Sequence, residues 1–389
     1  MPRLLTGGHL PASRGAVAHR GASLMAQLQI WGNDMATLYL TEPRSLVRKD
    51  SNTLVVHIPE NKERGTPKRK VRVPLIKVTQ VVVYGDVTLT SPALAALLEQ
   101  QADICFCSYS GRFLGRLAPP LSKNSLIRLE QHKAHHDPRR AFTLAQAFVR
   151  GKLSNMRVML LRANRKRDDP AIAQAAESLR GMVDQIDDLN PETIAAPPDP
   201  SRPQADSAYG TLLGLEGAGT ARYFGVFGGL LKDDWGFERR TKRPPRDPVN
   251  ALLSFGYVLL MNQVASAVSV VGLDPYVGFL HSSQFGKPAL ALDVMEAFRP
   301  LVVDSVVLTV LNNRMLTERD FREELGVWRL TDEGRRTFLT KFEERLDTEI
   351  RHPAFDYRAT YRRCLELEVR LVAKWLTGEI CEFRPFMVR

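Results

Sequence analysis

The spacing of hydrophobic and polar positions changes part-way along the chain. Between Met35 and about Leu117, β-branched and other apolar residues form short runs bounded by turn formers, as in "TLVVHIP" (53–59), "KVRVPLI" (70–76) and "KVTQVVVYG" (77–85). Such runs are typical of β-strands. The stretch "SPALAALLEQQ" predicts a short helix, and "DICFCSY" and "RFLGRL" predict two further strands. The pattern therefore predicts a small β-domain that contains one helix.

After the Pro-Pro pair at 119–120 the pattern becomes helical. An Asp-Pro dipeptide recurs at Asp137-Pro138, Asp169-Pro170, Asp247-Pro248 and Asp274-Pro275. Because Asp caps helices well and Pro fits the first helical position, each dipeptide predicts a helix start. Residues 139–165 and 171–189 have the pattern of amphipathic helices, and helices are expected to resume near Ser207 and to continue to about residue 376.

These patterns predict four parts. Residues 1–34 are expected to be a disordered extension or a start assigned too early, and residues 35–120 form the β-domain. Residues 121–136 are predicted to be a hinge, and residues 137–389 an all-helical domain. Within the last part, "NPETIAAPPDPSRP" (190–203) contains five prolines and predicts a mobile loop.

Composition adds information about partners and compartment. The chain has 54 Lys and Arg against 43 Asp and Glu, which gives a net charge of +11. This charge indicates a polyanionic partner such as nucleic acid, but it fits equally well a surface charge that only keeps the protein soluble. Its four cysteines are too few for a disulfide framework and fit a reducing cytoplasm. Cys105 and Cys107 are expected to share one face of a strand. No apolar stretch of about 18 residues occurs, so no transmembrane helix is expected.

Candidate chemistry is concentrated in "YVGFLHSSQFGKPALALDVMEAFRP" (276–300). His281 precedes a predicted helix that carries Asp293 and Glu296 among Ala, Leu, Val, Met and Phe. The two acids are three residues apart, so they share one helix face. Because a buried carboxylate is costly unless it is compensated, that face is either solvated or holds a cation.

A third acid, Glu216, is the only one in "YGTLLGLEGAGTARYFGVFGGLL" (209–231). Taken alone, Glu216 fits either a partly exposed residue near a helix end or a residue paired with Arg222, and His281 fits a core histidine. Taken together, one imidazole and two or three carboxylates suit Mg²⁺ or Mn²⁺. Arg299 and the basic segment before Asp247 add cations, and a metal with arginines suits phosphodiester chemistry.

Four motifs in succession resemble a known family. They are "EGAGTARYF", "RPPRDPVNALLSFGYVLL", "GFLHSSQFGKPALALDVMEAFRPLVVD" and "WRLTDEGRRTFLTKFEERL". Their order and context are similar to those of the CRISPR-associated spacer-acquisition integrases, the first of the Cas protein families, from about Met35 to the C-terminus. The resemblance implies an α+β protein with an N-terminal β-sandwich-like domain, which mediates dimerisation, and an all-α catalytic domain. It also implies a homodimer in the prokaryotic cytoplasm, a small ferredoxin-like partner nuclease, and double-stranded DNA, both spacer precursor and repeat array, as substrate.

The resemblance also assigns roles to residues. It implies that Glu216, His281 and Asp293 hold one Mg²⁺ or Mn²⁺, that Glu296 supports them, and that Arg299 contacts a phosphate. The residues expected to contact DNA are Arg240, Lys242, Arg243, Arg246 and Arg299. Arg246, with Asn250 in the same motif, is expected to organise either the site or the DNA.

The implied reaction is insertion of spacer DNA into a repeat array, by attack of a 3′-hydroxyl on a phosphodiester bond. This transesterification requires no ATP, and the chain has no GxxxxGK[ST] motif. With water as the nucleophile, the same site would act as a metal-dependent endonuclease. Two alternatives remain at this point: a transposon-borne integrase of the same superfamily, and a non-catalytic DNA-binding scaffold.

Overall fold

The computed structural model describes residues 36–61, 67–120, 122, 124–191, 208–241, 244–281 and 285–388. The predicted extension at 1–34, residues 192–203 of the predicted loop, and Lys242 and Arg243 lie outside the described residues. The predictions made for them stay predictions.

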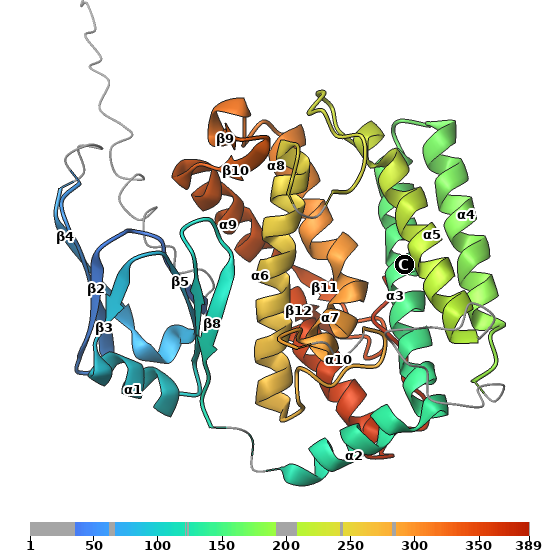
Figure 1. The fold of residues 1–389 in the computed structure, drawn as a ribbon, viewed down its shortest axis with the longest axis horizontal. Helices are drawn as coiled ribbons and strands as arrows, with labels where there is room; N and C mark the ends of the chain where they lie inside the picture. Colours follow the sequence, from blue (N-terminus) through green and yellow to red (C-terminus); the bar gives the residue numbers. More distant parts are fainter. Residues whose placement is uncertain are drawn as a thin grey trace, which may run out of the picture.

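Two four-stranded sheets form the N-terminal part (Figure 1). The first has the order β1 (Ala36–Leu40), β5 (Val78–Tyr84), β7 (Asp103–Cys107) and β8 (Phe113–Leu117). The second has the order β4 (Arg69–Pro74), β3 (Thr53–Ile58), β2 (Ser45–Asp50) and β6 (Val87–Leu89). Apolar residues of both sheets and of α1 (Ser91–Glu99) form one core, which confirms the β-sandwich-like prediction.

The first sheet is buried on both faces. On β5, Val81 belongs to the core between the sheets, whereas Val82 belongs to the core of the helical part. Cys105 and Cys107 on β7 lie on that second face, as their spacing predicts, and both are buried. The β-domain is therefore packed firmly against the helices through one of its sheets.

Helices make up most of the remaining chain. They are α2 (Ser125–His136), α3 (Pro138–Asn164), α4 (Pro170–Asp187), α5 (Ala208–Phe227), α6 (Pro248–Val271), α7 (Ala289–Met295), α8 (Ser305–Asn312), α9 (Asp332–Leu346) and α10 (Tyr361–Leu376). The hairpins β9–β10 (Phe321–Glu324, Val327–Leu330) and β11–β12 (Glu349–Arg351, Arg358–Thr360) add short strands to the part predicted to be all-helical. Helix α2 occupies most of the range predicted to be a hinge. In Figure 1, α3, α4 and α5 lie side by side, on the side of the molecule away from the sheets.

Three of the four Asp-Pro dipeptides start helices. Asp137, Asp169 and Asp247 each cap a helix with the side-chain carboxylate, and Pro occupies the first turn. The prediction for Asp274 is wrong, because its carboxylate accepts a hydrogen bond from the backbone N–H of Tyr276 in a turn and the next helix begins only at α7. The backbone N–H groups that follow this turn are bound by a carboxylate of the candidate site, as described below.

One described helix, α6, is long and apolar enough to span a membrane. However, 56% of its most apolar window is buried inside the protein, and the core helix of a soluble protein passes the same test. The helix is therefore only weak evidence for a membrane span.

The C-terminal segment runs back along α3, where Figure 1 marks the end of the chain. Asn155 of α3 is fully buried and holds this segment by its side-chain amide. Its Nδ2 donates to the carbonyl oxygens of Ala297 (2.7 Å) and Phe386 (2.8 Å), and its Oδ1 accepts from the N–H of Val388 (3.0 Å). The same side chain thus joins the end of the chain to the turn that follows α7.

Candidate active site

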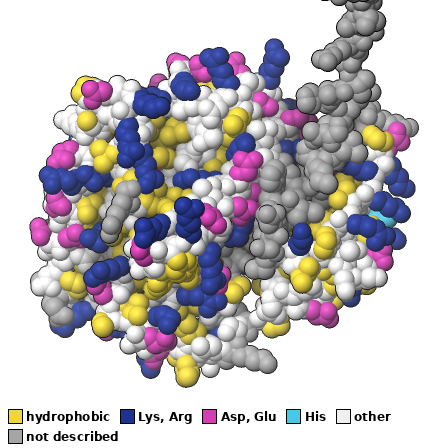
Figure 2. Space-filling view, turned by 180° about the vertical axis from the view of Figure 1, so that it is seen from behind, with side chains coloured by type: hydrophobic (Ala, Val, Ile, Leu, Met, Phe, Trp, Pro, Cys, Tyr) yellow, Lys and Arg dark blue, Asp and Glu magenta, His cyan; other side chains and the backbone are white. Residues whose placement is uncertain are grey.

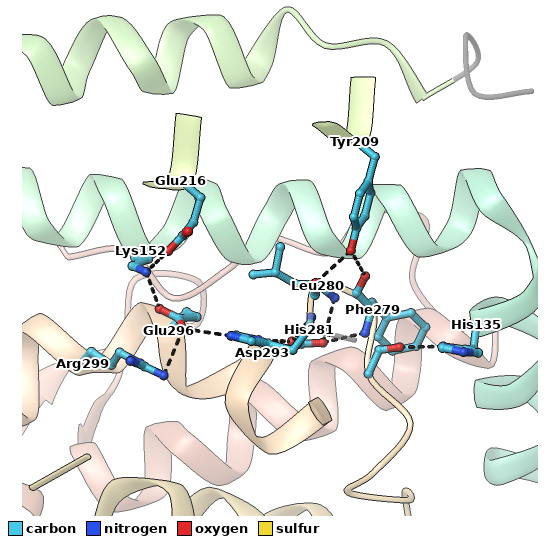
Figure 3. A network of polar contacts seen from close by, with 11 residues as sticks. His135, Lys152, Tyr209, Glu216, Phe279, Leu280, His281, Asp293, Glu296 and Arg299 are labelled. Atoms are coloured by element: carbon cyan, nitrogen blue, oxygen red, sulfur yellow. Dashed lines mark hydrogen bonds and ion pairs between the residues drawn. The ribbon is translucent and has the colours of Figure 1, made fainter. Parts of the chain in front are cut away.

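Four of the predicted site residues come from α5, from the loop before α7, from α7 and from the turn after it, and these converge in the helical part (Figure 3). Glu216 lies on α5, His281 lies in the loop before α7, and Asp293 lies on α7. Glu296 begins the 3₁₀ turn Glu296–Phe298 directly after α7. The structure brings all four side chains into one polar network, to which α3 contributes Lys152.

Asp293 is completely buried, and donors surround its carboxylate. Its Oδ2 accepts from the backbone N–H groups of Phe279 (2.6 Å) and Leu280 (3.0 Å). Its Oδ1 accepts from the backbone N–H of His281 (2.9 Å) and from Nδ1 of the same residue (2.7 Å). With four donors engaged, this carboxylate fixes the loop and the imidazole, an arrangement that differs from the predicted metal-ligand role.

Two glycines allow the elements to come this close. A Cβ atom on Gly278 would lie 2.8 Å from Oδ2 of Asp293, so only glycine lets the loop wrap that carboxylate. A Cβ atom on Gly219 would lie 2.6 Å from a methyl carbon of Leu153 on α3. Close approach of α5 to α3 at Gly219 brings Glu216, less than one helical turn away, within reach of α3.

Lys152 is the cation that joins two acids of the site. Its side chain is buried, with 4% of the residue exposed, and its Nζ forms an ion pair with Oε1 of Glu216 and a second with Oε2 of Glu296 (2.9 Å). Glu216 therefore pairs with a lysine from another helix and not with Arg222, the partner considered from the sequence. The hydroxyl of Thr220 also donates to Oε1 of Glu216 (3.2 Å).

Glu296 is buried among two cations and an imidazole. Nη2 of Arg299 lies 3.1 Å from its Oε1, and Nε2 of His281 lies 3.7 Å from the same oxygen. Burial alone would raise the pKa of this carboxyl group, but Arg299, Lys152 and His281 outweigh burial and hold the pKa at about 2. Glu296 is therefore a carboxylate at neutral pH and attracts cations strongly.

Arg299 is the first residue of a π-helical turn, Arg299–Asp304, whose last residue, Asp304, is also buried and is hydrogen-bonded through its carboxyl group. The guanidinium of Arg299 lies 4.8 Å from the ring centre of Tyr257, and the hydroxyl of Tyr257 donates to Oδ1 of Asp304 (2.6 Å). Tyr223 donates to the other oxygen (2.9 Å). Burial raises the pKa of Asp304 to about 6 although both hydroxyls stabilise its charged form. A π-helical turn is often found at functional sites.

Two of the residues predicted to contact DNA can be compared with this geometry. The guanidinium of Arg240 donates to Asn250 Oδ1 (2.7 Å) and to Ser254 Oγ (3.1 Å) and lies over Tyr257. Burial lowers the pKa of Arg240, whose half-buried side chain is held by these contacts, and its contact with DNA stays a prediction. Arg246 is exposed. Figure 2 shows Lys and Arg side chains distributed over both parts of the face drawn there, with no single patch.

Sequence reasoning missed Lys152, Tyr257 and Asp304. For Lys152 the available signal was a pair of polar residues, Lys152 and Asn155, on a helix face flanked by Phe148 and Met156. Tyr257 and Asp304 carry no comparable signal, because they are 47 positions apart and Asp304 lies in a π-helical turn that no local pattern predicts.

The donors present are of the chemical kinds that Mg²⁺ and Mn²⁺ bind. Glu216 and Glu296 offer carboxylate oxygens, and an ammonium already lies between them, so their surroundings favour positive charge. His281 offers Nε2, because Nδ1 is held by Asp293. Within the described parts of the chain, no three His, Cys, Asp or Glu side chains stand together at metal-ligand spacing. The two carboxylates are held by Lys152 instead.

Fold and site together define a mixed α+β protein whose helical part contains a largely buried cluster of acids, a histidine, a lysine and an arginine. The family described as "CRISPR associated protein Cas1" matches residues 38–344. The chain therefore belongs to the Cas1 family.

Individual relatives agree with this assignment. The chain is 36% identical over 358 residues to "CRISPR-associated endonuclease Cas1 3" of Thermus thermophilus, covering 92% of this chain and 99% of that protein. It is 37% identical over 358 residues to a "CRISPR-associated exonuclease Cas4/endonuclease Cas1 fusion" of Geobacter sulfurreducens, covering 90% of this chain but only 60% of the fusion. A solved Cas1 protein from Thermotoga maritima has the same fold, with a TM-score of 0.71 and 25% identity over 88% of this chain and 97% of that one.

Proposed function

We propose that this chain is a metal-dependent DNA integrase and endonuclease that inserts spacer DNA into a CRISPR repeat array. The observation that carries the proposal is the convergence of Glu216, Glu296 and His281 beside Arg299, in a member of the Cas1 family. A non-catalytic scaffold would need no such concentration of buried acids, because DNA binding alone requires cations.

Glu216, Glu296 and Nε2 of His281 would hold the divalent cation, and Asp293 would position His281. This assignment exchanges Asp293 and Glu296 relative to the expectation from sequence, because the carboxylate of Asp293 already accepts four hydrogen bonds. When bound, Mg²⁺ or Mn²⁺ supplies Lewis acidity toward a phosphoryl oxygen. The hydrogen bond from His281 to Asp293 keeps Nε2 directed at Glu296.

The remaining residues of the site bind and orient the DNA. Arg299 is 17% exposed at its side chain, so its guanidinium can contact a phosphate while it stays on Tyr257. The oxygen of the incoming 3′-hydroxyl forms a bond to phosphorus as the bond from phosphorus to the 3′-oxygen of the repeat strand breaks. The proton lost by the attacking hydroxyl is balanced by one gained by the leaving oxygen. The number of phosphodiester bonds is unchanged, so the reaction needs no ATP.

The partners proposed for this function follow from the family. They are double-stranded DNA as spacer precursor and as repeat array, a second copy of this chain, and the small ferredoxin-like nuclease of the same system, in the prokaryotic cytoplasm. The Geobacter relative carries its Cas1 part in one chain with Cas4. An exonuclease of that kind is therefore a reasonable further partner for this chain.

An integration assay tests the proposal. The full chain, its partner nuclease, a short duplex and a supercoiled plasmid that carries the repeat are incubated with Mg²⁺ or Mn²⁺. Wild type should form joined products, whereas Glu216→Gln, His281→Ala and Glu296→Gln should form none yet still bind the duplex. His281→Ala and Glu296→Gln should also lose the Mn²⁺-dependent rise in melting temperature. Normal integration by His281→Ala, with an unchanged Mn²⁺ effect on melting, would refute the metal site.

A further inference from the structure

Lys152 occupies an unusual position for a lysine. It lies in the middle of α3, where 4% of the residue is exposed, and its ammonium is shared between two carboxylates that come from different elements. A buried ammonium is costly unless it is paired, and here both ion pairs are made with acids proposed to hold the metal. Removing Lys152 would leave Glu216 and Glu296 facing each other with no cation between them, although Arg299 would still pair with Glu296.

A divalent cation between the same two carboxylates would lie next to this ammonium. Like charges at ion-pair distance repel strongly where water is largely excluded. Arg299 adds a further positive charge at Oε1 of Glu296. The ammonium of Lys152 and a divalent cation therefore cannot both lie between the carboxylates of Glu216 and Glu296.

We propose that Lys152 is the internal counter-ion of the metal-free site, and that it competes with the divalent cation for Glu216 and Glu296. This inference rests on the proposed function of the site and extends it. Lys152 keeps the acids together and the protein stable before the metal binds, and it lowers the affinity for the metal. A change that weakens the ion pairs of Lys152 but leaves Glu216 and Glu296 unaltered should therefore strengthen binding of the metal.

Calorimetric titration with Mn²⁺ alone, at pH 8 and without DNA, measures the competition directly. Lys152→Met should bind Mn²⁺ roughly tenfold more tightly than wild type, within the usual range of coupling between sites. In EDTA, Lys152→Met should melt at a lower temperature than wild type, and the rise in melting temperature on adding Mn²⁺ should be larger. Lys152→Arg, which keeps a cation, should not show the gain in affinity. Lys341→Met, which removes a lysine that pairs with Glu344 on α9, should match wild type.

The outcomes separate this inference from the proposed function. If wild type binds no Mn²⁺, the proposed metal site itself is wrong. If wild type binds Mn²⁺ and Lys152→Met binds it equally or more weakly, the metal site stands and the competition is refuted. If Lys152→Met is unfolded in EDTA, Lys152→Gln takes its place. Rescue of folding by Mn²⁺ supports competition, and failure of both variants to fold in excess Mn²⁺ refutes it.

Discussion

Nδ1 of His281 donates a hydrogen bond of 2.7 Å to Oδ1 of Asp293, which leaves Nε2 of the imidazole facing Glu296. One carboxylate therefore sets both the orientation of the ring and the nitrogen that is offered to a ligand. The same carboxylate binds three consecutive backbone N–H groups, so the imidazole and its loop are positioned as one unit.

Asp293→Asn should destabilise the protein by about 2–3 kcal/mol. Each carboxylate oxygen accepts from two donors, so an asparagine amide must turn its NH₂ group toward N–H donors in either orientation. Urea denaturation in EDTA measures the loss. Asp233→Asn, at an exposed ion pair with Arg314, serves as the control and should change stability by less than about 0.5 kcal/mol. Equal stability of Asp293→Asn and wild type would contradict the described hydrogen bonds.

Arg299→Ala should weaken DNA binding without unfolding the protein. Loss of one phosphate contact should flatten the log–log dependence of affinity on salt by roughly 0.9. Titrations of a labelled duplex between low and moderate salt give this slope. Arg319→Ala, in a short turn outside the site, is the control and should leave the slope unchanged. An unchanged slope and unchanged affinity for Arg299→Ala would show that this residue only supports Glu296.

Glu368→Gln should stabilise the protein at alkaline pH. Glu368 is buried on α10, and burial raises its pKa to about 8 from 4.5, although its Oε1 accepts from the N–H of Phe386. Between pH 4.5 and 8 the folded protein therefore retains a proton that the unfolded chain releases. The contribution of this group to stability falls as pH rises through that window, by up to about 1.4 kcal/mol per pH unit, and is constant above it.

Glutamine keeps the acceptor for the N–H of Phe386 and carries no charge. The stability of Glu368→Gln should therefore not fall with pH through this group. Urea denaturation at pH 5, 6.5 and 8 should show a gain over wild type that grows with pH. Glu366→Gln, which breaks ion pairs with Arg363 and Arg370 on the same helix, should show no such gain. A pH-independent difference between Glu368→Gln and wild type would mean that Glu368 is ionised at neutral pH.

Asn155→Ala should cost about 3 kcal/mol of stability and loosen the end of the chain. The side-chain amide of Asn155 makes three hydrogen bonds in a fully buried position. Alanine cannot make these bonds to the carbonyl oxygens of Ala297 and Phe386 and to the N–H of Val388. Hydrogen exchange should become faster at Val388. Ser154→Ala, at the adjacent, half-buried position on α3, should have little effect on either measurement.

Much of the architecture is visible in short-range sequence patterns. The face shared by Cys105 and Cys107 follows from an alternation of two, and three helix starts follow from Asp-Pro dipeptides. Asp274 fails to start a helix because the N–H groups after it bind Asp293, which no local pattern predicts. The spacing of Asp293 and Glu296 likewise predicts that they lie close together. It does not predict that the two acids have separate roles.

The role of Lys152 could not be predicted from such patterns. Its partner Glu216 is 64 positions away in the chain, and the approach of the two helices depends on how Gly219 fits against Leu153. A lysine in an amphipathic helix is ordinarily solvated, so its burial has to be seen in three dimensions.

The π-helical turn Arg299–Asp304 also limits which lengths this segment can have. Its two end residues are five apart and both engage Tyr257, whereas in a regular α-helix they would point about 140° away from each other. Deleting one residue within the turn would favour a regular helix and rotate Glu296 and Arg299 relative to α8. Proteins that keep this site should therefore tolerate substitutions within the π-helical turn far better than the deletion of one residue from it.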